Sequence, residues 1–200
     1  MTRFVAPVSL VGGHWVQLEP LSADHVSEIA SAASDGDPGQ LWFTSAPSPQ
    51  TAKEWVDRML SLQETGSLTL LVRTLDGTPV GSSSYLNVDG DNRRLEIGST
   101  WYASSARRTG VNSETKLLML SHAFETLNCV AVEFRTHFFN FTSRTAIERL
   151  GAKLDGVLRS HQLLPDGSRR DTVVYSILDH EWPSVRNQLI SRLSRHAPPE

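Results

Sequence analysis

The segment from Arg107 to Ser113 carries two arginines, one glycine and three small polar residues directly before a sequence that favours a helix. The first N–H groups of a helix have no intrahelical acceptor, and the aligned peptide dipoles add positive potential there. Gly110 would let a ligand approach the backbone closely, and Arg107 and Arg108 would add charge. We therefore expect an anion site suited to a pyrophosphate group. A basic loop with a capping glycine gives the same local pattern, so both interpretations stay open at this point.

A second polar segment, Asn140-Phe141-Thr142-Ser143, follows a β-branched strand and precedes a short helix. Asn and Ser are common helix caps, and capping alone would explain both side chains. The order of elements raises the odds of a binding role. Polar loops at the carboxyl ends of two adjacent parallel strands create the crevice in which α/β proteins usually bind ligands.

Two periodicities predict the elements that position these segments. Alternation of apolar and polar residues predicts strands, and a spacing of three to four residues predicts helices with one apolar face. The predicted strands cover residues 15–21, 68–74, 80–88, 93–102, 130–136, 154–164 and 171–178. The predicted helices begin at Ser22, at Ser48-Pro49, after Gly110, at Ser143 and at Asp179. Gly151 is expected to end the helix from Ser143 in a left-handed conformation.

The predicted strand 93–102 leads into the anion loop. Alternation gives it two distinct faces. The apolar face carries Leu95, Ile97 and Trp101, and the other face carries Glu96, Gly98 and Thr100. A helix joins this strand to strand 130–136, so we expect the two strands to be parallel. The buried stripe of that helix is predicted to be Leu117, Leu120, Phe124 and Leu127.

Composition excludes several classes of protein. With 39% apolar and 20% charged residues, the 200-residue chain is typical of a globular domain with a full core. A net charge of −3 argues against a general nucleic-acid binder. Cys129 is the only cysteine, which excludes an internal disulfide and a cysteine-based zinc site and predicts a buried thiol. His14, His25, His180 and His196 show no metal-ligand pattern with carboxylates, so we expect no metal. No stretch approaches the roughly 20 apolar residues of a membrane span and no signal peptide is evident, so we expect no membrane partner and a cytoplasmic location.

The order strand, two helices, three-stranded meander, loop and helix, strand, helix and hairpin resembles the GNAT acetyltransferase fold over nearly the whole chain. The family's pyrophosphate loop has the pattern Gln/Arg-x-x-Gly-x-Gly/Ala, and the segment from Arg107 to Asn112 matches all but the last position. Five further segments are similar: Asn140 to Ser143, Leu150-Gly151-Ala152, Glu96-Ile97-Gly98, His122-Ala123-Phe124-Glu125 and Arg169-Arg170-Asp171-Thr172. Within the superfamily, the chain is similar to the branch that contains the N-terminal acetyltransferases of ribosomal proteins.

The resemblance implies an α/β (α+β) fold with a mixed sheet of about seven strands flanked by helices. Two splayed parallel strands would form an acetyl-CoA crevice. It implies one GNAT domain over residues 1–200, with a frayed tail over residues 194–200. It also implies direct transfer of an acetyl group from acetyl-CoA to a primary amine in one ternary complex. The alternative is a GNAT fold that binds coenzyme A without catalysis, for regulation or assembly. A nucleotide-binding α/β protein would need a Walker-type lysine loop or a complete dinucleotide glycine pattern, and the chain has neither.

The resemblance assigns cofactor binding to both polar segments, that is to Arg107, Arg108, Thr109, Gly110, Val111, Asn112, Ser113, Asn140 and Ser143. Glu96 is the first candidate for the base that removes the amine proton, directly or through water. The alternative is that Glu96 faces solvent or pairs with Arg94. Many family members have a tyrosine at the position of Ile147, which is proposed to protonate the departing thiolate. Isoleucine cannot do this, so Ser143 becomes the candidate for a hydrogen bond to the sulfur, with water as the alternative acid.

Trp42 and Phe43 lie between the first two helices, where this family often walls the acceptor site; core packing is the alternative. His137 and His161 are rival candidates for a role in the reaction, and either could face the substrate cleft. The alternative for each is a histidine that is exposed or satisfied by hydrogen bonds. The acceptor itself stays open among a protein N-terminus, a free amino acid, a polyamine and an aminoglycoside. A homodimer would be ordinary for this family.

Overall fold

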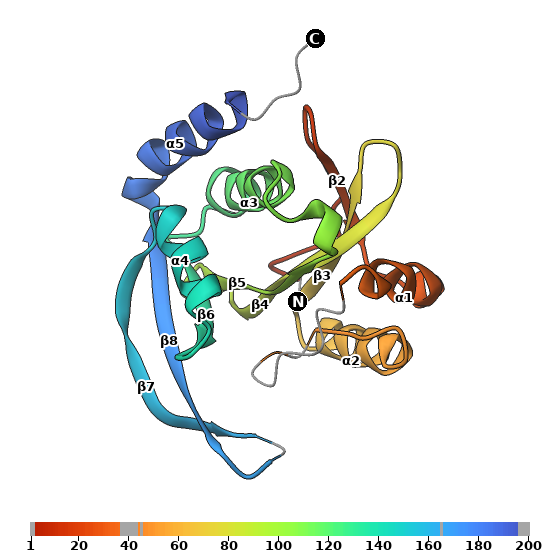
Figure 1. Ribbon diagram of the computed structural model, residues 1–200. Coiled ribbons are helices and arrows are strands. Elements are labelled where there is room, and N and C mark those ends of the chain that lie inside the picture. The colour runs from red at the N-terminus through yellow and green to blue at the C-terminus, as the bar shows by residue number, and fades with distance from the viewer. Residues whose placement is uncertain (1–2, 37–43, 45, 165, 196–200) are drawn as a thin grey trace.

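The computed structural model describes residues 3–36, 44, 46–164 and 166–195. Its strands form one mixed sheet in the order β1-β2-β3-β4-β5-β6-β8-β7 (Figure 1). The strands are β1 Leu10–Val11, β2 Val16–Pro20, β3 Leu68–Thr74, β4 Pro79–Asp89, β5 Arg94–Tyr102, β6 Ala131–His137, β7 Lys153–Leu163 and β8 Arg169–Leu178. All neighbouring pairs are antiparallel except β5 and β6, which are parallel as the connecting helix predicts. The sequence predicted seven of these strands; the eighth, β1, is too short to produce a periodic pattern.

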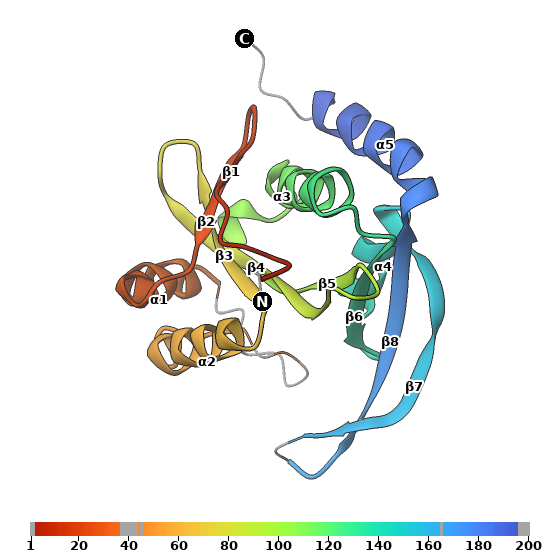
Figure 2. The same cartoon turned by 180° about the vertical axis from the view of Figure 1, so that it is seen from behind.

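Helices cover both faces of the sheet (Figures 1 and 2). They are α1 Val26–Ser34, α2 Ala52–Glu64, α3 Val111–Ser121, α4 Phe141–Arg149 and α5 Trp182–Ser194. The helices α1 and α2 pack on each other and on β3 and β4, and their apolar cluster includes Ile29, Met59 and Leu71. The helices α3, α4 and α5 cover the opposite face, where a larger cluster includes Leu120 and Phe134. The sheet is therefore buried on both sides around its centre.

A β-bulge in β5 makes the prediction for the faces of Trp101 and Thr100 wrong. The register between β4 and β5 shifts between Ser82 and Ser84, and Ser99 has a φ of 46°. The extra residue reverses the alternation. Trp101 therefore packs against α2, with its ring centroid 5.9 Å from that of Trp55. Thr100 faces α3 instead.

The predicted helix boundaries also needed correction. The helix α2 begins at Ala52, because Ser48 and Thr51 exchange backbone-to-side-chain hydrogen bonds of 2.9 and 3.2 Å in a preceding turn. Leu62, which has helical spacing from the buried residues Trp55 and Met59, is 38% exposed. The helix α4 begins at Phe141, and Gly151 follows it with the predicted positive φ, 99°.

The helix α3 differs from its predicted apolar stripe. Leu120 and Phe124 are buried as predicted, whereas Leu117 and Leu127 are only partly buried. Four polar residues of its first half are buried instead: Ser113, Glu114, Thr115 and Lys116. After Ser121 the chain continues in a π-helical turn, His122–Thr126.

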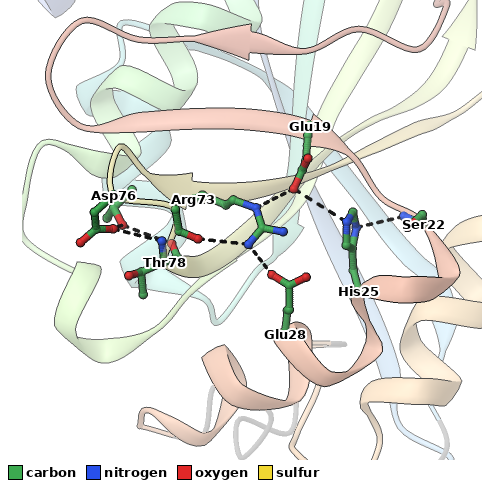
Figure 3. Close-up of polar contacts among 9 residues, drawn as sticks. Glu19, Ser22, His25, Glu28, Arg73, Asp76 and Thr78 are labelled. Carbon is green, nitrogen blue, oxygen red and sulfur yellow. Dashed lines mark hydrogen bonds and ion pairs between the residues drawn. The ribbon is translucent and has the colours of Figure 1, made fainter.

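Ion pairs fasten α1 to the edge of the sheet. Figure 3 shows Arg73 of β3 between Glu19 of β2 and Glu28 of α1. The Nε of Arg73 donates to Glu19 at 2.5 Å, and its Nη1 donates to Glu28 and to the carbonyl of Gly77. His25 lies 3.8 Å from Glu19 in the same cluster. The Arg73 hydrogen bond lowers the pKa of Glu28 below its ordinary value. Every charged group of this cluster has a partner, so it serves the fold.

Candidate active site

The two parallel strands part within the sheet. Backbone register joins them only from Arg94 to Glu96 on β5 and from Ala131 to Glu133 on β6. Beyond this point β5 continues to Tyr102 and β6 to His137, but the two strands no longer pair with each other. The loops that follow the two strands lead directly into α3 and α4, so both helix N-termini lie at the edge where the strands diverge.

Glu96 lies at the last position of β5 that pairs with β6. Its side chain is 6% exposed, which excludes the solvent-facing alternative. Its Oε2 accepts a hydrogen bond of 2.6 Å from Asn87 Nδ2 and lies 3.7 Å from Arg135 Nε. Arg94 pairs with Glu133 and not with Glu96, so the second alternative is wrong as well.

The surroundings of Glu96 make its carboxylate more basic than an ordinary one. Burial raises the pKa of its carboxyl above the ordinary value, and the charge of Glu133 adds to that rise. The guanidinium of Arg135, the Asn87 hydrogen bond and the charge of Arg170 oppose it. A raised pKa makes a carboxylate a stronger base.

The predicted anion loop follows β5 and a short 3-10 turn, Ser104–Ala106. Arg107 and Arg108 are exposed, and Arg108 has a φ of 63°. Thr109 Oγ1 accepts from the N–H of Val111 at 3.2 Å, so this threonine caps the start of α3. The next N–H groups, of Asn112 and Ser113, are in the first turn and have no intrahelical acceptor. The donors and charges of this loop therefore fit a phosphate group.

Gly110 is small for a reason that local sequence did not suggest. A Cβ atom at this position would lie 2.3 Å from Nε1 of Trp15 and 2.4 Å from its Cε2. Its φ of −72° is accessible to any residue, so the indole, not the backbone conformation, requires glycine. Packing against Trp15 therefore requires glycine at this position whether or not a ligand approaches the backbone.

Glu114 and Lys116, both on α3, are buried polar residues that sequence reasoning missed. The carboxylate of Glu114 accepts four backbone N–H groups at 2.7 to 3.1 Å, those of Gly13, His14, Trp15 and Val16. This clamp fixes the turn between β1 and β2 against α3, and with it the indole on Gly110. Its partners lie about a hundred residues away in sequence, so no local pattern indicates it.

The Lys116 side chain is 5% exposed and contacts hydroxyl groups. Its Nζ donates to Ser83 Oγ at 2.9 Å and to Thr100 Oγ1 at 2.7 Å, next to the bulge of β5. Among the residues that the structure describes, no carboxylate forms an ion pair with it. Burial lowers the pKa of this amine to about 7.

The second polar segment lies at the start of α4. Asn140 is the N-cap, and its Oδ1 accepts from the N–H of Ser143 at 3.0 Å, so capping accounts for one half of the amide. Ser143 is partly buried in the first turn. Ile147 is 8% exposed and belongs to the apolar core. The hydroxyl of Tyr175 lies beside the same helix, where it donates to Glu148 at 2.9 Å and accepts from Arg144 at 3.2 Å.

The aromatic and histidine predictions have different outcomes. Trp42 and Phe43 lie outside the described residues; nearby, Thr44 and Ala46 line a small pocket of about 40 Å³ with Ser99 of the β5 bulge. His161 on β7 is exposed, and its Nδ1 lies 3.1 Å from Thr172 Oγ1. His137 is buried, its Nδ1 accepts from the N–H of Phe139 at 3.1 Å, and burial lowers its pKa.

The thiol of Cys129 and a bound metal ion are two other possible sources of reactivity. Cys129 is 2% exposed, as predicted, and burial raises the pKa of its thiol to about 11, which leaves it protonated and unreactive. Over residues 3–36, 44, 46–164 and 166–195, no group of three or more His, Cys, Asp or Glu side chains could hold a metal ion. In the same residues, no helix has the length and apolar character needed to cross a membrane.

A family model described as the acetyltransferase (GNAT) domain matches residues 16–153, which include β5, the anion loop, α3, β6 and α4. The chain belongs to the GNAT acetyltransferases. As a GNAT protein it is an acyltransferase, and the parting of β5 from β6 follows the expectation for that fold.

Individual relatives agree with the family. The Bacillus subtilis (strain 168) protein named "Putative ribosomal N-acetyltransferase YdaF" is 29% identical over 175 residues, which are 82% of this chain and 90% of the relative. The crystal structure of a GCN5-related N-acetyltransferase from Brucella melitensis has a TM-score of 0.84 at 28% identity, covering 94% of this chain and 86% of that one. Mycobacterium smegmatis RimJ, solved in complex with CoA-disulfide, shares the fold with a TM-score of 0.73 at 22% identity, covering 93% and 95%.

Proposed function

We propose that this GNAT protein transfers the acetyl group of acetyl-CoA directly to a primary amine, with Glu96 as the base that accepts the amine proton. The observation that carries the proposal is the place of Glu96, buried at the point where β5 and β6 part. Burial raises the pKa of this carboxylate and so makes it a stronger base than a solvated carboxylate. Asn87 holds its Oε2, so Oε1, which lies beside Gly98, would take the proton from the acceptor or from a relaying water.

The anion loop is the proposed site for the pyrophosphate of coenzyme A. Bound there, coenzyme A would supply the acetyl thioester. The N–H groups of Asn112 and Ser113 would donate to phosphate oxygens, and Arg107 and Arg108 would add charge from the exposed side. Thr109 and Val111 hold the loop in shape, through the cap at 3.2 Å and a buried valine side chain. That Mycobacterium smegmatis RimJ was solved with a CoA compound supports this assignment.

The N-terminus of α4 is the proposed site for the sulfur end of the cofactor. The cap uses Asn140 Oδ1, which leaves its Nδ2 to donate to the pantetheine arm. Ser143 would hydrogen-bond the departing thiolate, while a proton reaches the sulfur from water, since Ile147 has none to give.

The acceptor face is the face of the sheet that carries Glu96. It continues across β6 and β8 as a groove of about 380 Å³ that includes Glu133, Arg135 and Val174. Such an open groove suits an extended acceptor, and the name of the Bacillus subtilis relative favours a protein N-terminus. A small-molecule amine is the other acceptor class that the proposal includes.

The test is turnover of acetyl-CoA with a panel of amines: peptides with free N-termini, amino acids, a polyamine and an aminoglycoside. We expect acetylated product by mass spectrometry for at least one class. Glu96→Gln should lower its formation by about 10² to 10⁴ and leave acetyl-CoA binding nearly unchanged. The parent rate should fall as the pH drops through the raised pKa of Glu96, and this acidic limb should vanish in Glu96→Gln.

Glu54→Gln is the matched control, because Glu54 is exposed on α2 and belongs to neither of the diverging strands nor to the loops that follow them. Saturating acetyl-CoA, at about a hundred times its dissociation constant, should stabilise the parent and both variants by about 2.7 kcal/mol. A protein without any thermal shift, or without product from any amine, would reject the proposed function. Near-normal turnover with an intact acidic limb in Glu96→Gln would reject Glu96 as the base.

A further inference from the structure

The hairpin of β7 and β8 brings a guanidinium onto the face of Glu96. Arg170 lies on β8 two residues from Thr172, so the two side chains share one face of the strand. Thr172 is the register partner of His137 on β6, and Glu133, on the same face of β6, is the register partner of Glu96. One continuous face of the sheet therefore connects Arg170 with Glu96.

A hydrogen bond directs Arg170 along this face. Its Nε donates to Thr172 Oγ1 at 3.1 Å, which turns the side chain back along β8 to the residue whose register partner is His137. The guanidinium is near enough to Glu96 and His137 to act on both, since its charge lowers the pKa of each. Burial lowers the pKa of Arg170 itself, and the charge of Glu96 partly compensates.

The carboxylates around Arg170 are occupied by other groups. Asp171 accepts from Arg159 Nε and from the N–H of Ser160, both at 2.7 Å. Glu133 pairs with Arg94 and Arg135. Within the part of the chain that the structure describes, Arg170 forms no ion pair, and its two terminal nitrogens donate no hydrogen bond.

A partly buried guanidinium with two free terminal nitrogens is a receptor for a planar anion. Its parallel N–H groups match the two oxygens of a carboxylate, and partial burial strengthens such a pair. Glu96 does not fill this role, because Asn87 and Arg135 hold its Oε2 and no hydrogen bond joins it to Arg170. An anion that arrives with the acceptor would fill this role, because it could accept hydrogen bonds from the two terminal nitrogens of Arg170.

We propose that the acetyl acceptor carries a carboxylate near its amine, and that Arg170 binds this carboxylate while Glu96 receives the amine proton. The inference rests on the proposed function, since it concerns the acceptor of the same reaction. The carboxylate has two sources: the main chain of a free amino acid, or an acidic side chain close to the N-terminus of a peptide. His161 contacts the same Thr172 hydroxyl and lies beside the proposed carboxylate subsite.

The experiment compares acceptors that differ by one charge. One pair is an α-amino acid and its amide; the other is a peptide with Asp at its second position and the same peptide with Asn. We expect kcat/KM to be about 10- to 100-fold higher for the charged member of one pair, mainly through KM. The pair that discriminates identifies the source of the carboxylate.

The variants assign the preference to Arg170. Arg170→Gln should remove it by weakening only the charged acceptor, and Arg170→Lys should keep part of it, because an ammonium retains the charge but not the fork. Arg169→Gln is the matched control, since Arg169 is exposed and points to the other face of β8. An unchanged thermal shift with acetyl-CoA verifies that each variant is folded.

The rival role for Arg170 is to tune Glu96 alone. Arg170→Gln would then slow both members of each pair by the same factor and move the acidic limb of both pH profiles upward. That result would overturn the inference, and so would a parent enzyme with equal kcat/KM for the charged and neutral members of both pairs. Neither result would contradict the proposed function. Absence of turnover with every amine would instead reject the proposed function, and the inference with it.

Discussion

Replacing Lys116 by methionine should change how the stability of the protein depends on pH. The buried amine has a pKa of about 7 in the folded chain, against an ordinary value of 10.5. Between these values the unfolded chain binds the proton more tightly, so stability rises with pH. Burial of the Lys116 amine lowers the free energy of unfolding by its full amount below pH 7, and this loss of stability disappears as the pH approaches 10.5. A shift of this size corresponds to about 5 kcal/mol, of which about 2 kcal/mol is recovered between pH 7 and pH 9.

Lys116→Met removes this titration and keeps a similar volume in the core. It also removes two hydrogen bonds, each worth about 0.5 to 1.5 kcal/mol. Ser83 and Thr100 are not stranded, because their hydroxyl oxygens lie 2.8 Å apart and can bond each other. We therefore expect the variant to be about 2 kcal/mol more stable than the parent at pH 7, with the advantage disappearing near pH 9.

Urea unfolding at a series of pH values between 6 and 10 measures the difference in the free energy of unfolding between parent and variant. Taking the difference cancels groups common to both chains, such as Cys129 and Tyr85, whose raised pKa values act in the opposite direction. Lys53→Met, at an exposed position of α2, controls for replacing a lysine as such. If the difference in free energy of unfolding between parent and variant stays constant from pH 7 to pH 9, the prediction of a buried, weakly basic amine at Lys116 is wrong.

Two further predictions concern the contacts beneath the anion loop. Glu114→Gln should lower the free energy of unfolding by about 3 kcal/mol or more, because an amide oxygen cannot accept four N–H groups and its own NH₂ opposes them. Thermal unfolding against the control Glu54→Gln checks this, and equal melting temperatures would contradict it. Gly110→Ala should cost about 1 to 3 kcal/mol through its clash with the indole, and much less when Trp15 is also replaced by alanine. A double-mutant cycle by urea unfolding measures this coupling, and additive effects would exclude the clash.

The parts of the fold that sequence could predict are those set by local patterns. Alternation at 68–74 and 130–136 and the glycine at 151 predicted elements that the structure contains. The bulge at Ser99 could not be predicted, because serine has no preference for positive φ that would distinguish it from its neighbours. One residue in that conformation reversed the predicted faces of Thr100 and Trp101.

The candidate site was predictable where it depends on chain order and not where it depends on distant partners. Glu96 was predicted from its place on the polar face of a strand and from the family resemblance, and the loop from Arg107 to Ser113 from its place between that strand and a helix. The burial of Glu96 under Asn87 and Arg135 needs the sheet register, and the indole of Trp15 on Gly110 joins segments 95 residues apart. Such contacts have no period in the sequence.

The clamp made by Glu114 has a consequence for the order in which the chain folds. Its four hydrogen bonds join residues 13–16 to a carboxylate about a hundred positions later. During synthesis, the turn between β1 and β2 must therefore wait until α3 has left the ribosome, and closing so long a loop is slow compared with forming the local β3–β4 hairpin. We infer that the anion loop acquires its final shape late, together with the first strand. A chain halted before α3 also lacks β6, so it would expose the edge of β5 that pairs with β6 in the folded protein, and such an edge is open to wrong pairing with another molecule.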